Sequence, residues 1–302
     1  MFPRLLQEGG LSLDRLQSFC LVAQAGGVTK AAKGDPAKQS LFSRQIKELE
    51  EFFGTELIRR KGRGVTLSEA GERLNIIARE CFASLSDFRS ECKGRPVEVV
   101  LGTGDSIIHW LLMPRLAELR DRIPNVRWKF LNLSTGDAVR RLVDGVIDFA
   151  LVRKDAIVRP LQARSLGVMG YSLFIPTALE VSAGRKNGLR LLDGLPLVTL
   201  EGEGSFRSEL AAMTKKQGMK VNIEVECSSF PLAARSVAKG DMAAILPSIA
   251  AHDLRDAGVR EVRVEFLKHF DREMCLASNV RLARIRPMLQ QVGTVLTRVC
   301  RF

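Results

Sequence analysis

The sequence predicts an α/β protein in three consecutive parts. Short helical patterns and a basic, glycine-containing turn occupy residues 1–67. One helical pattern without an internal break runs through residues 68–93, and short apolar strands alternate with helices from residue 94 onward. A chain of 302 residues is longer than a domain with one ordinary hydrophobic core, and its length is typical of two or three domains.

Composition describes a globular protein, with 46% hydrophobic and 26% charged residues. No apolar run reaches the roughly 18 residues that span a bilayer, and the first ten residues lack the apolar stretch of a signal peptide. We therefore expect a cytoplasmic protein with no membrane partner. The net charge of +12 favours a polyanionic partner. It divides into +3 for residues 1–93 and +9 for residues 94–302, so charge does not locate the binding end.

The cysteines and histidines predict neither a disulfide framework nor a metal site. The cysteines are scattered without a Cys-x-x-Cys pair, and three histidines offer little to a zinc ion. We interpret the six cysteines as small buried hydrophobic residues: Cys20, Cys81, Cys92, Cys227, Cys275 and Cys300.

Three helices are predicted near the N-terminus. The first has an apolar face at three- and four-residue steps, formed by Leu13, Leu16, Phe19, Cys20 and Ala23. A short second helix covers Thr29 to Lys33, and Gly34-Asp35-Pro36 then forces a turn. The third helix runs from about Lys38 to Phe53 and ends at Gly54.

The third helix carries the most specific pattern. An apolar stripe is predicted to face a core: Phe42, Ile46, Leu49 and Phe53. The opposite side holds Gln39, Ser40, Ser43, Arg44 and Lys47. Such groups pair with base edges and phosphates. In an isolated helix a solvated polar face would explain them, but the two short helices and the turn before them favour a helix-turn-helix. Thr29 and Lys38 complete the predicted DNA-binding set of these helices.

A basic turn follows, with Arg59, Arg60, Lys61 and Arg63 around Gly62 and Gly64. Cations held this close repel one another, and contact with phosphates or the minor groove relieves the repulsion. We predict that Arg59, Arg60 and Arg63 form a DNA-contacting wing, with a solvated basic loop as the alternative.

Ordered matches extend through this region: Phe19, Ala31-Ala32, Gln39 to Ile46, Leu49-Glu50, Phe53-Gly54, Leu57 to Arg60, Arg63 and Leu67 to Gly71. They strongly resemble the LysR-type family of transcription regulators. The resemblance implies a winged helix-turn-helix that binds an operator in double-stranded DNA. The chain departs from the family pattern at Gly27, at Asp35-Pro36 and at Lys38, which bears on the packing of the turn and on the DNA preference.

Residues 68–93 predict a long linker helix, capped by Ser68 or by a capping box of Thr66 with Glu69. A heptad seam runs along it through Leu74, Ala78, Cys81, Leu85 and Phe88. The seam packs either on its own chain or on a second copy, and the resemblance implies antiparallel pairing of two copies. Lys93 to Pro96 is the predicted hinge.

Residues 94–302 predict two clusters of strands and helices. The first has strands at 97–101, 126–133 and 148–152, and the pattern favours a parallel sheet. The second has strands at 171–175, 197–200, 222–227 and 243–246. A strand at 273–277 and a helix to Val299 return to the first. This order resembles the effector domain of the family, a periplasmic-binding-protein-like pair of lobes: lobe I at about 96–168 and 270–302, lobe II at about 169–269.

Ligands of open α/β sheets bind beyond the carboxyl ends of strands, beside helix N-termini. The residues at those points are Thr103, Ser106, Ser134, Thr135, Arg153, Ser205 and Phe206. Ordinary helix caps are the alternative for the hydroxyls, and a surface ion pair is the alternative for Arg153. The resemblance implies that they converge on an effector pocket, and the charge of this region favours a small anionic effector.

Other classes of function lack their signals. The sequence has no nucleophile elbow, phosphate-binding loop or dinucleotide fingerprint, which argues against an enzyme. A solute-binding module would not carry a DNA-binding segment, and an architectural DNA protein would not need the α/β domain. We expect a transcription regulator without metal or cofactor that responds to a small-molecule effector. The family further implies a homotetramer assembled as a dimer of dimers, with RNA polymerase as partner if the protein activates transcription.

Overall fold

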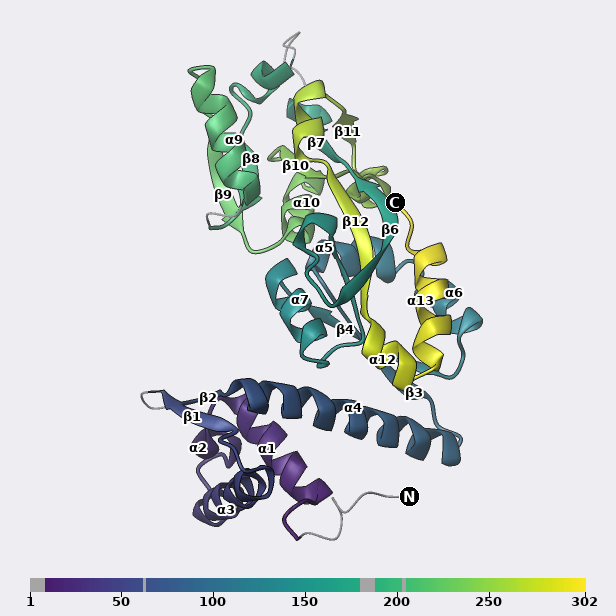
Figure 1. The fold of residues 1–302 in the computed structure, drawn as a ribbon. Helices are drawn as coiled ribbons and strands as arrows, with labels where there is room; N and C mark the ends of the chain where they lie inside the picture. The colour runs from purple at the N-terminus through teal and green to yellow at the C-terminus, as the bar shows by residue number, and fades with distance from the viewer. Residues whose placement is uncertain (1–8, 62–63, 180–187, 203–204) are drawn as a thin grey trace. The chain divides into compact units, whose positions relative to one another are not determined.

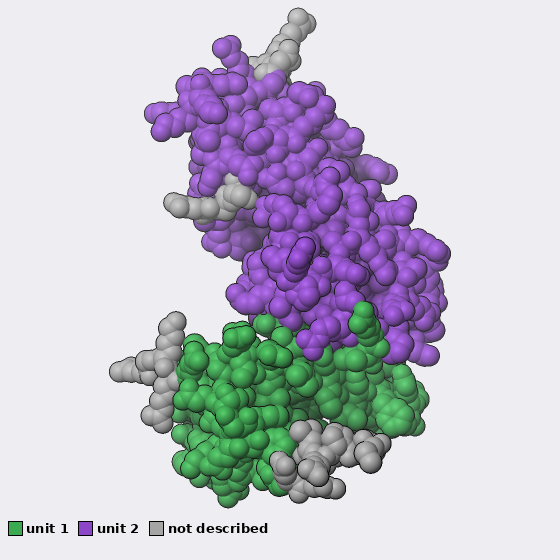
Figure 2. Space-filling view, viewed as in Figure 1, with its two compact units in different colours: residues 1–97, 144–146, 284–286 green, residues 98–143, 147–283, 287–302 purple. Residues whose placement is uncertain are grey.

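The computed structural model describes residues 9–61, 64–179, 188–202 and 205–302. The chain divides into two compact units (Figure 2). Unit 1 contains residues 1–97, 144–146 and 284–286, and unit 2 contains residues 98–143, 147–283 and 287–302.

Unit 1 consists of α1 (Leu13–Ala25), α2 (Val28–Ala31), α3 (Pro36–Phe53), β1 (Ile58–Lys61), β2 (Gly64–Leu67) and α4 (Glu69–Cys92). Helix α3 begins earlier than predicted, because the Asp35 side chain accepts hydrogen bonds from the N–H groups of Ala37 and Lys38. Of the two predicted caps of α4, the structure selects Ser68, whose hydroxyl accepts from the N–H of Gly71 at 3.0 Å.

The core of unit 1 joins α1, α3, the wing and the first half of α4. Its buried residues are Phe19, Cys20, Val22, Ala32, Phe42, Ile46, Leu49, Leu57 and Ala78. The apolar stripe predicts Phe53 among them, but its side chain is 38% exposed. Helix α3 ends at Gly54 with a positive φ of 64°, and the chain turns back so that Leu57 fills the core instead.

Lobe I of unit 2 is built on a five-stranded sheet in the order β4-β3-β5-β12-β6. The strands are β3 (Val97–Thr103), β4 (Val126–Asn132), β5 (Phe149–Arg153), β6 (Leu161–Met169) and β12 (Arg272–Asn279). Strands β3 and β5 are parallel as predicted, but β12 pairs antiparallel with both β5 and β6, so the sheet is mixed. The return of the chain to lobe I through β12 agrees with the prediction from sequence.

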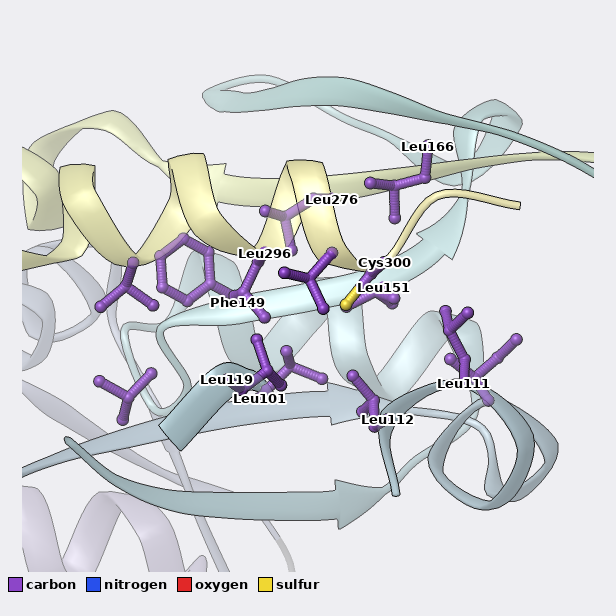
Figure 3. Packing of buried hydrophobic residues seen from close by; sticks show 14 of the residues in the cluster. Leu101, Leu111, Leu112, Leu119, Phe149, Leu151, Leu166, Leu276, Leu296 and Cys300 are labelled. Atoms are coloured by element: carbon purple, nitrogen blue, oxygen red, sulfur yellow. The ribbon is translucent and has the colours of Figure 1, made fainter. Parts of the chain in front are cut away.

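Helices cover both faces of this sheet (Figure 1). Helix α7 (Thr135–Val143) lies on one face, and α6 (Leu116–Arg122) and α13 (Met288–Val299) lie on the other. Figure 3 shows the second interface, where Leu296 and Cys300 from the C-terminal segment meet Leu151 and Leu276 of the sheet. These side chains are almost fully buried, and their burial is the main source of stability of the lobe.

Lobe II contains two smaller sheets. Strand β7 (Tyr171–Pro176) is central and pairs antiparallel with β10 (Ala244–Pro247) and β11 (Val259–Val262). Strand β8 (Leu197–Leu200) runs parallel to β9 (Ile223–Cys227). Helices α9 (Ser205–Lys216) and α10 (Phe230–Ala238) follow β8 and β9. Short helices complete the chain: α5 (Asp105–Ile107), α11 (Ala251–Leu254) and α12 (Val280–Ile285).

Two general properties of the described residues bear on function. None of their helices is long and apolar enough to cross a membrane. Within the same part of the chain, no group of three or more His, Cys, Asp or Glu side chains is arranged to hold a metal ion.

Candidate functional site

Helix α3 separates its polar and apolar sides as the sequence predicts. Ser40, Ser43, Arg44 and Lys47 are exposed, and Gln39 is half-buried. Two hydrogen bonds that the sequence pattern did not reveal hold the helix against α1. Ser18 Oγ donates to Gln45 Oε1 at 2.5 Å, and Arg15 Nε donates to Glu48 Oε2 at 2.5 Å. Helix α1 thus fixes the orientation of the exposed face.

Among the residues that the structure describes, the cations of this face have only weak partners. Arg44 lies 3.8 Å from Glu48, Lys47 lies 3.6 Å from Glu51, and Lys38 lies 3.7 Å from Asp35. All three basic side chains are more than 60% exposed. Such pairs contribute about 0–1 kcal/mol, so exchanging them for a phosphate or a base costs little.

The predicted wing is a two-stranded antiparallel ribbon. Its register pairs Ile58 with Leu67 and Lys61 with Gly64. A hydrogen bond of 3.0 Å from the N–H of Val65 to the carbonyl of Gly26 ties the ribbon to the end of α1. Arg59 is exposed on β1, as is Thr29 on α2. The backbone of Arg60 belongs to β1, its side chain lies outside the described part, and Arg63 lies outside the described residues.

The predicted seam of α4 divides into two parts. Leu74 packs on the core of unit 1 and Ala78 is fully buried in it, so these two residues contact their own chain. Cys81, Leu85 and Phe88 are exposed, Phe88 by 64%. The structure therefore corrects the seam, because only its second half is available to a second copy. Cys81 and Cys92 are also exceptions to the prediction of six buried cysteines.

Two of the four strand-end hydroxyls of lobe I, those of Thr103 and Ser134, make hydrogen bonds within the chain. Thr103 is buried, and its Oγ1 donates to the carbonyl of Leu151 at 2.7 Å. Strand β3 extends two residues further than expected and incorporates Thr103 into the sheet, so this hydroxyl already has a partner there. Ser134 caps α7 by accepting from the N–H of Asp137 at 3.1 Å and donating to its carboxylate, and this hydrogen bond lowers the pKa of Asp137. Ser106 and Thr135 are half-buried.

On lobe II, the predicted residues follow β8. Ser205 begins α9, and its side chain lies outside the described part. Phe206 joins an aromatic cluster, with ring centroids 5.6 Å from Tyr171, 5.9 Å from Phe230 and 4.9 Å from Phe270. Burial raises the pKa of Tyr171 to about 12. The sequence pattern places Tyr171 at a strand start but does not identify it as part of this cluster.

Arg153 lines a cavity of about 710 Å³ to which both lobes contribute. The cavity is lined by four basic or imidazole side chains, Arg153, Lys154, His269 and Arg272, and by four carboxylates, Asp155, Glu209, Asp271 and Glu273. Of the predicted hydroxyl residues whose side chains the structure describes, none is among them. The sequence pattern does not identify Glu209, Asp271 and Arg272, because Glu209 lies within a helix and the other two lie at the start of a strand that enters the sheet in reverse.

A helix-turn-helix with a two-stranded wing, followed by a two-lobed α/β domain, is the arrangement of a one-component transcription regulator. The chain belongs to the LysR family of such regulators. Residues 94–299 match the LysR substrate binding domain, and residues 13–72 match the bacterial regulatory helix-turn-helix protein, lysR family. The protein is therefore a DNA-binding transcription regulator with an effector-binding domain, and not an enzyme.

Similar proteins agree in length and fold. The chain is 27% identical over 257 residues to the probable nitrogen assimilation transcriptional activator of Synechococcus elongatus, a match that covers 81% of each chain. A full-length variant of OxyR from Pseudomonas aeruginosa has a TM-score of 0.66 at 18% identity, over 96% of this chain and 95% of that chain. Full-length CbnR complexed with its target DNA has a TM-score of 0.55 at 19% identity, over 93% and 100% of the two chains.

Proposed function

We propose that α3 reads base edges in the major groove of an operator while the wing contacts the DNA backbone. One observation carries this proposal: the apolar side of α3 is buried in unit 1, and its opposite side exposes hydroxyl, guanidinium and ammonium groups. Guanidinium groups bind guanine bidentately, and hydroxyls accept or donate to several bases. Arg44 and Ser43 are the principal readers, with Gln39, Ser40, Lys47, Lys38 and Thr29 around them.

The double variant Ser43→Ala with Arg44→Ala tests this assignment. Each good base contact carries roughly 1–3 kcal/mol of discrimination, so sequence-specific protection in a footprint should be lost. Thermal unfolding should stay close to that of the wild type, because both side chains are exposed. Protection of the operator equal to that of the wild type would show that another surface reads the DNA.

Arg60→Gln is the matched control on the wing. A phosphate contact carries no base information. Its loss should weaken binding to all duplexes alike and lower the slope of log K against log salt by about 1. A selective loss at the operator would instead place Arg60 among the base-reading residues.

We also propose how the protein assembles and which part of the chain has which role. Residues 1–67 bind DNA, residues 68–93 pair with a second copy through the exposed half of α4, and residues 94–302 bind the effector. Paired effector domains supply the second interface of a dimer of dimers. The protein acts in the cytoplasm, where it reaches its operator, and contacts RNA polymerase if it activates transcription.

The effector is proposed to be a small molecule with a carboxylate that binds between the lobes. The cavity beside Arg153 supports this, because side chains of both lobes line it and a ligand there would bridge them. A guanidinium is the strongest partner that a protein offers a carboxylate. To regulate, the ligand must bind one arrangement of the protein more tightly than the other, since equal affinity shifts nothing.

A further inference from the structure

The charges that line the Arg153 cavity do not favour a simple anion. Arg153, Lys154 and Arg272 contribute three positive charges, and four carboxylates oppose them. With His269 neutral the lining carries a net charge of −1. The positive charge of residues 94–302 therefore lies mostly elsewhere on the domain, and it gives no preference for an anion in this cavity.

Most of these charges are already paired. Arg272 Nη2 donates to both carboxylate oxygens of Glu209, at 3.1 and 3.0 Å, and Lys154 Nζ donates to Glu273 Oε2 at 2.7 Å. His269 Nε2 lies 3.4 Å from the Glu209 carboxylate. A ligand that used Arg272 or Glu209 would have to break their bidentate pair, and Lys154 and Glu273 already neutralise each other.

Two groups of opposite charge, Arg153 and Asp271, remain able to pair with charged groups of a ligand. Arg153 approaches Asp155 only at 3.6 Å, and Asp155 is 69% exposed, so water screens the pair. Among the described residues, the ion pairs of this cavity use the carboxylates of Asp155, Glu209 and Glu273 and not that of Asp271. Arg153 faces Met274 across the β5–β12 pair, and Asp271 immediately precedes β12, so the two groups border the same end of the sheet.

Tyr171 of the aromatic cluster lies near the charges of this cavity but is not part of its lining. Tyr171 is the single tyrosine of the chain, and the charges of Arg153, Arg272, Glu209 and Asp271 all act on its hydroxyl. Its ring stacks on Phe206.

We propose that the Arg153 cavity binds a zwitterion, an α-amino acid, with the carboxylate on Arg153 and the ammonium on Asp271. This inference rests on the proposed function, because it names the chemical class of the effector. Two complementary charges of the ligand leave neither protein group unpaired. An analogue without the amino group offers no partner to Asp271. An amine without the carboxylate offers no partner to Arg153.

Calorimetric titration of the full-length chain with the twenty standard L-amino acids tests the proposal. For the amino acid that binds most tightly, the matching 2-hydroxy acid and the decarboxylated amine should each bind at least about tenfold more weakly, because each loses one charged contact. Arg153→Gln should weaken binding of the amino acid by a similar factor. Asp271→Asn should remove the preference for the amino acid over the hydroxy acid.

Arg127→Gln is the control, because it also removes a positive charge from lobe I but interrupts an exposed pair with Glu98 that is not part of the cavity lining. It should change affinity by less than about threefold, as expected for an exposed pair. Circular dichroism of each variant checks that it folds.

Three outcomes would overturn the inference: no amino acid binds the wild type, the hydroxy acid binds as well as the amino acid, or Asp271→Asn keeps the preference. Operator footprints separate this failure from failure of the proposed function. If a ligand without an ammonium changes the footprint, the regulator stands and only the class of effector is wrong.

Discussion

Single residues decide where the elements of unit 1 begin and end. Asp35 and Pro36 depart from the family pattern, and in the structure both lie at the start of α3. The Asp35 carboxylate caps α3, and Pro36 occupies its first turn, where a missing N–H group costs nothing. The departure thus creates a well-capped reader helix that begins two residues before the predicted start.

The surroundings of each cysteine determine the pKa of its thiol and therefore its reactivity. Burial raises the pKa of Cys20, raises that of Cys275 to about 11 and raises that of Cys300 to about 12. Near neutral pH these three side chains remain thiols. Because the thiolate is the reactive form, they resist oxidation and alkylation.

Alkylation with iodoacetamide at pH 8, read by peptide mass spectrometry, should therefore modify Cys81 and Cys92 first. Cys20, Cys275 and Cys300 should react only after unfolding. Urea-denatured protein provides the control in which all six cysteines react alike. Rapid modification of Cys300 in the native protein would contradict the burial that Figure 3 shows for it.

At the scale of elements, α4 serves two purposes along its length. Its first half completes the core of unit 1 through Ala78, and its second half exposes Leu85 and Phe88. The heptad pattern predicts a continuous apolar seam but cannot distinguish these partners, because a core of the same chain and a second copy both select apolar residues. The position of α1 and β2 against the helix decides which half is covered.

Leu85→Glu should reduce the oligomer to smaller species in size-exclusion chromatography with light scattering. The change puts an unpaired charge into the proposed contact between copies, where its desolvation is costly. Ser86→Glu, on an exposed neighbouring position, should leave the mass unchanged. An unchanged mass for Leu85→Glu would remove the second half of α4 as a contact.

At the scale of the whole molecule, two units with separate cores carry the two activities. The core of unit 1 contains the residues that support α3, and the other hydrophobic clusters belong to unit 2. Each unit then has its own free energy of unfolding. A ligand raises that free energy only for the unit that contains its binding site.

Scanning calorimetry of the full chain should resolve two transitions. Double-stranded DNA at low salt should raise the midpoint temperature of the transition of unit 1. The midpoint of the transition of unit 2 should stay within about 1 °C, because the free energy of binding stabilises only the folded unit that binds. Repeating the scan at high salt should cancel the shift, since the contacts are mainly with phosphates. A single transition that DNA shifts as a whole would contradict independent units.

The order of elements, the helix-turn-helix, the wing and the two-lobed α/β domain could all be predicted from the sequence. These features follow from periodicity, turn residues and caps, which act over a few positions along the chain. Two strands escape such a prediction. Most residues of β6 are exposed and show no regular alternation, and β11 has only four residues.

Which polar groups meet depends on the tertiary structure. Thr103 has the sequence position of a ligand contact and is a hydrogen-bonded part of the sheet. Arg153 instead lines one cavity with Asp271 and Arg272, because β12 enters the sheet in reverse between β5 and β6. Neighbours in sequence select helices and turns, since those interactions span a few residues. A cavity is lined by residues more than a hundred positions apart, and strand order alone brings them together.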